Sequence, residues 1–370
     1  MLGRKLVLAL GFMAGVYHST ARAVSFTEDF SADPSNTWSF GIGNNSFNQF
    51  SWTNAAARYS NDAPGELDVH LDSSLPTARF QRPLGVTLTD TNDYVLTTRF
   101  SFTVTSAPAD QDMQIAFGLV NSNLTGGNRT GSPGIYTDDD TFNSVEFDYF
   151  PNANPWDPTL TPAVFGAQLP DDDAFANFTA LFGNDSNLGT HTNGITSLPQ
   201  AVTLQATMIY NAATKLLKLT IYMVNADGFL SPLDTTEPPL NLSAPGQYSQ
   251  YYTNAPFNVD SLAIMAYHDG FTTADDPSLV ADLTFQRFTF STEIPQPPAV
   301  SIQLVDTNVV LTFATVSNYL YEVQSTTNVA AGNWSTLASN IVGTGDLAVT
   351  TDFDGATAPA RFYRVGLTVQ

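Results

Sequence analysis

Short runs of alternating apolar and polar residues fill most of this 370-residue sequence and constrain its fold more than any other feature. Clusters of Gly, Pro, Asn and Asp separate these runs, and almost no stretch has the spacing of an amphipathic helix. Many short strands at close spacing in one long segment predict a large antiparallel β-sandwich. The clearest predicted strands cover residues 93–104, 113–120, 143–150, 201–211, 215–224, 261–268 and 283–291.

The sequence also predicts two β domains of unequal size. Residues 293–299, EIPQPPA, are proline-rich and predict a stiff, extended linker. Before this linker, residues 24–292 carry the large sandwich, and after it residues 300–370 form a small β domain. A small domain without disulfides needs large apolar groups to be stable, so we expect its aromatic residues to lie in its core. These are Tyr319, Tyr321, Trp334, Phe362 and Tyr363.

The N-terminal residues have the features of an export signal. Arg4 and Lys5 precede an apolar run over residues 6–16, and Ala21-Arg22-Ala23 matches a signal peptidase site. We therefore expect residues 1–23 to be a signal peptide, cleaved after Ala23, and the mature protein to be secreted. The apolar run is too short to span a bilayer, so no membrane insertion is expected. The sequence has no cysteine, so a large core or a bound metal must replace disulfide bonds.

The charge balance narrows the classes of partner. The sequence has 13 Lys and Arg against 35 Asp and Glu, a formal net charge of −22. Nucleic acids and anionic membranes are bound through basic patches, which makes both poor partners for this protein. Acidic polysaccharides are disfavoured for the same reason, which leaves neutral glycans or surfaces bridged by divalent cations. Acidity also keeps an exported protein soluble, so charge alone does not identify a partner.

Residues 144–158, SVEFDYFPNANPWDP, gather several acidic side chains next to aromatic ones. The first half alternates like a strand, which places Glu146, Asp148 and Phe150 on one face. Two carboxylates on the same face repel each other unless a positive charge lies between them. The strand half therefore predicts a metal site.

The second half of this segment is interrupted by prolines and predicts a loop. It adds an amide oxygen from Asn152 and a carboxylate from Asp157, and such hard oxygen ligands are the ones that calcium prefers. Trp156 is an aromatic platform for the apolar face of a sugar, or else it packs the loop onto the sheet. The alternative for Asn152 and Asp157 is that they are only turn residues.

Six segments follow one another over residues 94–269: TTRFSF, MQIAFGL, GGNRTGSPGIY, NSVEFDYFPN with WDP, the hairpin IYNAATKLLKL and LAIMAYHDG. Their order resembles the legume-type (L-type) lectins of the concanavalin A-like superfamily. The resemblance implies a concanavalin A-like antiparallel β-sandwich (jelly roll), followed here by a small C-terminal β-sandwich domain, and a carbohydrate-binding function. In that family the strand-and-loop motif supplies a calcium site and an adjacent transition-metal site.

The resemblance assigns a role to each residue of the motif. Calcium would be bound by Asp148, the carbonyl of Phe150, Asn152 and Asp157, and Glu146 would face the second metal. Where the family has a histidine for that metal, this chain has Thr161-Pro162-Ala163, which puts the transition-metal site in doubt. His191 replaces that histidine only if residues 159–190 are an inserted loop.

The same resemblance implies the sugar-binding residues. The amide of Asn152 would bond a sugar hydroxyl while the ring of Phe150 stacks on the sugar, and Trp156 lies beside them. The family also uses an acidic residue and a glycine, for which Asp112 and Gly127 are the candidates here. Asp112 lies one residue earlier than the family pattern, because Met113 occupies that register.

An enzyme on the same sandwich is the main alternative. Laminarinase-like glycoside hydrolases carry E-x-D-x-E or E-x-D-x-x-E on one strand, and here the last Glu is replaced by Phe150 or Pro151. Glu146 and Asp148 would be the catalytic pair of a hydrolase, but they lack a separate proton donor.

A polysaccharide lyase and a non-catalytic role are the remaining alternatives. A lyase would use Tyr267 or His268 as a base together with Arg287. A surface or adhesive protein would use the sandwich only as a module. The sequence favours binding over catalysis and leaves the sugar, the oligomeric state and the role of the C-terminal domain open.

Overall fold

The computed structural model describes 21 segments of the chain, and within them it is built from β-strands and three short 3₁₀ turns. This confirms the predicted all-β fold class. No helix in these segments is long and apolar enough to cross a membrane. The described residues are 24–45, 49–59, 63–72, 75–106, 115–126, 128–129, 143–150, 159–165, 174–176, 179–180, 184–185, 189–190, 202–232, 239–243, 256–266, 268–269, 280–294, 298–316, 319–344, 346–358 and 360–369.

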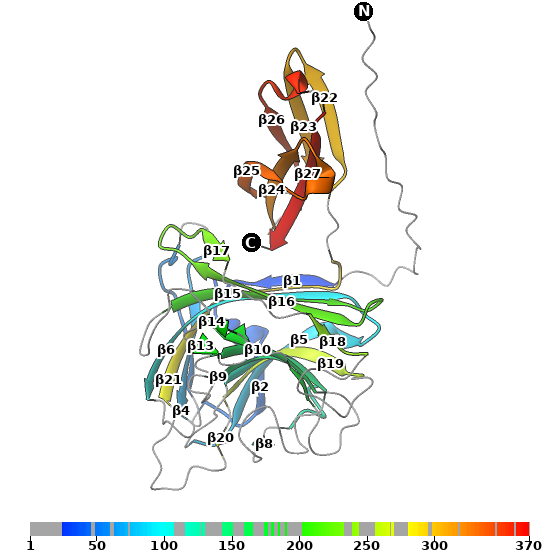
Figure 1. The fold of residues 1–370 in the computed structure, drawn as a ribbon. Coiled ribbons are helices and arrows are strands. Elements are labelled where there is room, and N and C mark those ends of the chain that lie inside the picture. Colours follow the sequence, from blue (N-terminus) through cyan, green and yellow to red (C-terminus); the bar gives the residue numbers. More distant parts are fainter. Residues whose placement is uncertain are drawn as a thin grey trace, which may run out of the picture.

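Two large antiparallel sheets pack face to face in the first part of the chain (Figure 1). The nine-stranded sheet has the order β17-β16-β15-β6-β21-β4-β3, with β1 paired to β21 and β18 paired to β16. Its strands are β1 (Ser25–Glu28), β3 (Gln49–Thr53), β4 (Glu66–Asp72), β6 (Tyr94–Ser106), β15 (Val202–Asn211), β16 (Leu216–Val224), β17 (Leu230–Pro232), β18 (Leu240–Asn241) and β21 (Val280–Ser291).

The eight-stranded sheet has the order β11-β10-β9-β7-β19-β5-β2, with β12 paired to β10. The seven strands predicted from alternation are all present, divided between the two sheets. The strands of this sheet are β2 (Ser39–Ile42), β5 (Ala78–Thr89), β7 (Ile115–Val120), β9 (Ser144–Phe150), β10 (Thr159–Phe165), β11 (Ala174–Ala176), β12 (Thr179–Ala180) and β19 (Asn258–Ala266). Two further pairs are β8 (Asn128–Arg129) with β20 (His268–Asp269), and β13 (Asn184–Asp185) with β14 (Gly189–Thr190).

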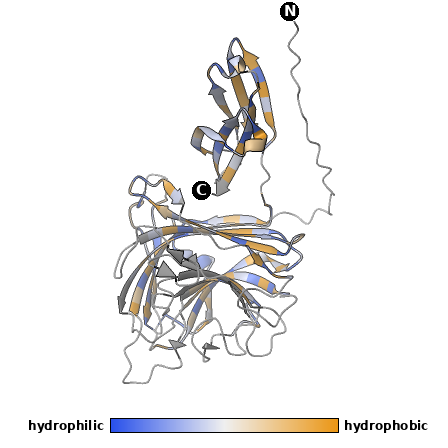
Figure 2. Cartoon of the chain, in the orientation of Figure 1, coloured by the Kyte–Doolittle hydropathy of each residue, from blue (hydrophilic) through white to orange (hydrophobic). Residues whose placement is uncertain are grey.

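The core lies between the two sheets and is rich in aromatic rings. Apolar and polar residues alternate along the strands, so each sheet has one face toward the core (Figure 2). Phe100 of the nine-stranded sheet meets Phe117 of the eight-stranded sheet at 4.8 Å between ring centroids, and Phe117 stacks on Phe147 at 5.2 Å. All three side chains are fully buried, and each contributes about 2 kcal/mol of hydrophobic stabilisation.

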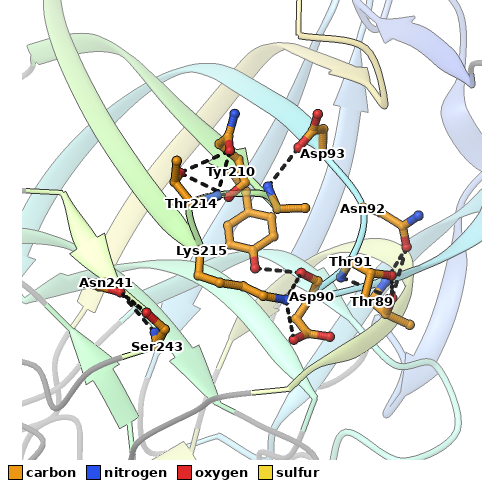
Figure 3. A network of polar contacts seen from close by, with 12 residues as sticks. Thr89, Asp90, Thr91, Asn92, Asp93, Tyr210, Thr214, Lys215, Asn241 and Ser243 are labelled. Carbon is orange, nitrogen blue, oxygen red and sulfur yellow. Dashed lines mark hydrogen bonds and ion pairs between the residues drawn. The ribbon is translucent and has the colours of Figure 1, made fainter. Parts of the chain in front are cut away.

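The predicted hairpin is formed by β15 and β16, which pair from Leu204 with Met223 to Asn211 with Leu216. A polar network ties its turn to the turn between β5 and β6 (Figure 3). The Tyr210 hydroxyl donates to the Asp90 carbonyl oxygen at 2.8 Å, and Lys215 Nζ donates to the Asp90 carboxylate at 2.7 Å. The two turns therefore hold each other in place.

The C-terminal part is a small sandwich of two three-stranded sheets, with the orders β22-β23-β26 and β25-β24-β27. Its core is a separate apolar cluster around Leu311, Phe313 and Val323. Val95 of β6 and Ile209 of β15 belong to the same cluster, so the small sandwich packs on the outer face of the nine-stranded sheet. The strands are β22 (Val300–Val305), β23 (Asn308–Ala314), β24 (Tyr319–Thr326), β25 (Ser335–Val342), β26 (Leu347–Asp352) and β27 (Phe362–Val369).

The expectation that the aromatic residues of this domain lie in its core is correct for Tyr319 and Tyr321, which are buried. It is wrong for Phe362, which is 42% exposed. Phe362 begins β27, and the period of the strand turns its neighbour Tyr363 to the core and Phe362 to the other face. Trp334 is partly buried under the guanidinium of Arg364, which lies 4.4 Å from the ring centroid.

Candidate functional site

Strand β9 forms the first half of the predicted metal and sugar site, and it lies between β7 and β10. Val145 and Phe147 point into the core between the sheets. Glu146 lies on the opposite face, which is here called the outer face, and it is fully buried. The backbone of Asp148 follows at the same period. The predicted strand and its alternation are therefore present.

The close approach of β7 and β9 at Glu146 requires a glycine. Gly118 is the β7 residue that pairs with Glu146. A Cβ atom on Gly118 would lie 2.5 Å from Glu146 Cα and closer still to the Val145 carbonyl oxygen. The absence of a side chain at Gly118 thus allows a carboxylate to stand on this strand face.

Of the remaining predicted site residues, Phe150 ends β9, and the others lie outside the described part of the chain. The strands from which these segments continue nevertheless have their ends together at one end of the eight-stranded sheet. Ile115 pairs with Tyr149, Phe150 pairs with Thr159, and Met265 pairs with Ala116. The start of β7, the end of β9 and the end of β19 are therefore neighbours. The residues outside the described segments are Asp112, Gly127, Asn152, Trp156, Asp157, His191 and Tyr267.

A buried arginine holds the segment that leads from β7 to this end of the sheet. Arg79 of β5 is 2% exposed, its Nη1 donates to the Thr125 carbonyl oxygen, and its Nη2 donates to the Ser122 carbonyl oxygen at 3.0 Å. The turn at 121–125 is thereby folded back over the outer face. Farther along, β8 pairs with β20, the strand that follows β19. The sequence analysis missed Arg79, and no local pattern around it distinguishes it from a surface arginine.

The histidine expected for a transition metal has no counterpart on the neighbouring strand. Thr161 of β10 pairs with Asp148, and Ala163 of β10 pairs with Glu146. The positions directly across from both acids thus carry a hydroxyl and a methyl group. Within the described segments, no three His, Cys, Asp or Glu side chains are grouped closely enough to hold a metal ion.

A second polar region lies on the outer face of the nine-stranded sheet. It is an open pocket of about 500 Å³ that spans β3, β4 and β21. His70 Nδ1 lies 2.6 Å from the Asp282 carboxylate, and the Thr284 hydroxyl donates to Asp68 at 2.9 Å. Asp68 and His70 alternate with core residues in ELDVHLD, which is the signal that the sequence analysis overlooked. The pocket offers hydrogen-bond acceptors to hydroxyl or ammonium groups.

Glu66 extends the same polar row along β4, beside Arg58. Arg58 Nη2 lies 3.4 Å from the Glu66 carboxylate. Burial raises the pKa of Glu66, and the positive charge of Arg58 opposes that rise. The row therefore combines carboxylates in different environments along one strand.

Of the three residues considered for a lyase, Tyr267 lies outside the described residues, and the strands of the other two belong to different sheets. Arg287 belongs to β21 of the nine-stranded sheet and pairs with Arg99 on its outer face. His268 belongs to β20, which follows the eight-stranded sheet. Of the hydrolase pair, Glu146 has no exposed surface through which it could reach a polysaccharide.

The class of protein that this architecture defines is an antiparallel β-sandwich with a second, smaller sandwich. No protein-family model matches the sequence, and a search of curated proteins also finds no match. Among solved structures, the chain is similar to peanut lectin in complex with a 9-residue peptide, with 15% identity, a TM-score of 0.36, and coverage of 75% of this chain and 100% of that one.

Two other solved structures are similar to the same extent. Basic winged bean lectin with Tn-antigen has 16% identity and a TM-score of 0.38, covering 74% of this chain and 100% of its own. The Emp47p carbohydrate recognition domain has 13% identity and a TM-score of 0.38, covering 75% of this chain and 100% of its own. Values this low do not transfer a ligand or a site from those proteins to this one.

Proposed function

We propose that this protein is a secreted, calcium-dependent carbohydrate-binding protein that takes neutral glycans at the end of its eight-stranded sheet. The site is built by residues 148–157, with Asp112 and Gly127 contributing from neighbouring segments. Calcium is bound by Asp148, the Phe150 carbonyl, Asn152 and Asp157. Sugar is bound by the ring of Phe150, the amide of Asn152 and Trp156.

The observation that carries this proposal is that the start of β7, the end of β9 and the end of β19 lie together at one end of the eight-stranded sheet. The end of β9 lies next to the start of β7, so the segments containing Asn152 and Asp112 both leave from the same place. Binding sites are commonly made by connecting segments that a rigid scaffold holds together. The net charge of −22 supports a neutral rather than an acidic glycan.

The donor set suits calcium better than a transition metal. Two carboxylates, one amide oxygen and one carbonyl are hard oxygen ligands, which calcium accepts at six to eight positions. Transition metals favour imidazole, and β10 supplies none across from Glu146 and Asp148. In this role calcium fixes the loop, and the residues of the loop bind the sugar.

Thermal melting of the full chain with EDTA, and then with calcium restored, tests the metal. A ligand at 100 times its Kd stabilises the folded state by about 2.7 kcal/mol, so we expect a clear and reversible loss of melting temperature in EDTA. Asp157→Asn should abolish the response to calcium. Asp227→Asn removes a charge from an exposed turn between β16 and β17 and should leave the response intact. A melting temperature indifferent to EDTA in the unmodified chain contradicts the calcium site.

A glycan array with and without calcium tests the sugar site. We expect binding to neutral glycans that requires calcium and is lost in Asn152→Ala. A Glu146→Gln variant separates binding from catalysis, because only a hydrolase would lose release of oligosaccharides with this change. Glycan binding that is unchanged in both Asp148→Ala and Asn152→Ala would place the function elsewhere on the molecule.

A further inference from the structure

Arg79 of β5 is among the largest fully buried side chains of the described residues, and it lies on the outer face of the eight-stranded sheet. Its neighbours in the strand, Ala78 and Phe80, belong to the core between the two sheets, so the period of the strand turns Arg79 to the other face. Taking a guanidinium group out of water is costly unless hydrogen bonds compensate for it. The groups that Arg79 holds therefore matter.

Arg79 holds a turn that begins at the far end of the sheet. Arg79 and Ala116 both pair with Met265, so they lie in one row at the end where the glycan site is proposed, here called the site end. Val120, which precedes the turn at 121–125, is four residues from Ala116, or about 13 Å along the strand. Arg79 nevertheless donates to two carbonyl oxygens of the turn. The chain after Val120 thus turns back over the outer face toward the site end.

The same segment is fixed a second time at the site end itself. Residues 128–129 form β8, which pairs with β20, the strand that follows β19. Gly127, one of the proposed sugar-binding residues, is joined covalently to Gly126 and Asn128. Consecutive Cα atoms are about 3.8 Å apart, so the contacts on both sides limit where Gly127 can lie.

The turn does not need Arg79 in order to close. The side-chain oxygen of Asn121 already accepts hydrogen bonds from two later amides of the turn, both at 3.0 Å. Arg79 instead joins the turn to β5, and Asp260 joins it to β19 by accepting from the amide and the hydroxyl of Ser122 at 2.9 Å each. The internal bonds set the shape of the turn, and the bonds to the sheet set its place.

We propose that Arg79 is a positioning residue for glycan binding, a role that rests on the glycan site proposed above. Arg79 holds the turn at 121–125 over the outer face, and the turn sets the place from which Gly127 enters the site. A binding residue that is already held in place loses less conformational freedom when the ligand binds. Arg79 acts through the turn and does not contact the sugar.

This role predicts that Arg79 affects glycan binding without affecting calcium binding. The proposed calcium ligands lie in residues 148–157, which begin in β9, and the strands β7 and β19 lie between β9 and β5. A general loss of stability would weaken the binding of both calcium and glycan. A displaced turn would weaken the binding of glycan alone.

The test compares two arginines of β5 in the full mature chain. Arg79→Met removes the bonds to the turn. Arg82→Met is the matched control, because it removes an ion pair with Glu28 at 2.7 Å and a contact with the ring of Phe26 at 4.0 Å. Both variants should melt at a lower temperature than the unmodified chain.

The readout is binding of the neutral glycan that gives the strongest array signal with the unmodified chain, measured with calcium and well below the melting temperatures. We expect its Kd to rise about tenfold in Arg79→Met and to stay unchanged in Arg82→Met. The change of melting temperature in EDTA should be the same in both variants as in the unmodified chain.

A second variant decides the outcome if Arg79→Met does not fold. The Thr125 hydroxyl donates to the Asn143 carbonyl oxygen at 2.9 Å, and Thr125→Val removes this bond while keeping the shape of the side chain. It should also weaken glycan binding and leave the response to calcium intact. Unchanged glycan binding in Arg79→Met and Thr125→Val would overturn the inference, as would equal losses in Arg79→Met and Arg82→Met. An unmodified chain that binds no glycan would overturn the proposed function as well, so the two failures are distinguishable.

Discussion

Gly118 and Glu146 face each other on β7 and β9, and the backbone of β9 fills the space that a side chain on Gly118 would need. Gly118→Ala should therefore destabilise the large sandwich by about 2–4 kcal/mol, since backbone atoms and not a flexible side chain must move. Urea unfolding measures this loss. Gly366→Ala in β27 is the matched control, because a Cβ there meets no atom within 4 Å, and it should be neutral or slightly stabilising. Equal stability of both variants would contradict the close approach.

Arg79 should stabilise the turn at 121–125 through its hydrogen bonds to two carbonyl oxygens of that turn. Arg79→Met removes two donors from the carbonyl oxygens of Ser122 and Thr125, and we expect a loss of about 2–4 kcal/mol. Arg79→Lys should recover little, because an ammonium group lacks the planar fork of the guanidinium. Hydrogen exchange should show the effect at residues 121–125 first. Wild-type exchange in this turn for Arg79→Met would contradict the role of Arg79.

The hydrogen bonds and the ion pair between Lys215 and Asp90 in Figure 3 predict that Lys215 stabilises the hairpin of β15 and β16. Lys215→Met removes the bonds to the carboxylate and carbonyl oxygens of Asp90, which should cost about 1–2 kcal/mol. Lys218→Met, at an exposed position on β16, is the control and should cost less than about 0.5 kcal/mol. Chemical denaturation of both variants compares them directly. Indistinguishable unfolding midpoints would show that Asp90 does not anchor the hairpin.

The small sandwich should lose stability at alkaline pH. Burial, and then the hydrogen bond to Asp352, raise the pKa of Tyr363 to about 12. Because the folded pKa exceeds the value of about 10 in the unfolded chain, folding favours the neutral phenol. Stability is complete below about pH 10 and falls as pH rises toward 12.

Absorbance of the phenolate and thermal melting followed by calorimetry, both between pH 9 and 12, measure this loss. Tyr363→Phe should lower the stability at neutral pH but weaken its dependence on pH in this window. Tyr319, whose pKa burial also raises to about 12, retains the rest of the dependence. A titration of Tyr363 near pH 10 in the folded chain would contradict the prediction.

If the proposed sugar site is correct, Trp156 should report on it. Glycan binding should change the tryptophan fluorescence, and Trp156→Phe should remove the change and weaken binding by about tenfold, because aromatic stacking supplies part of the affinity. Trp334→Phe is the control, since Trp334 lies in the small sandwich against Arg364. A full fluorescence change in Trp156→Phe would exclude Trp156 from the site.

The sequence allowed the large sandwich to be predicted because alternation is a local signal. The runs that became β6, β15, β16 and β21 each carry apolar residues at every second position, and the turn between β15 and β16 is short enough to fix their pairing. Phe362 was assigned to the wrong face, because an aromatic residue at the start of a strand does not reveal by itself which face it takes.

For the candidate site, too, some features follow from neighbouring residues in the sequence, and others depend on contacts between residues far apart in the chain. The sequence alone placed Glu146 and Asp148 on one face of a strand, because the period of a strand requires only neighbouring residues. Only the tertiary structure decided that Gly118 lies against Glu146 and that Arg79 holds the turn at 121–125. These relationships join residues far apart in the chain, and they depend on which strands pair and which edges stay free. A one-dimensional pattern does not encode that order.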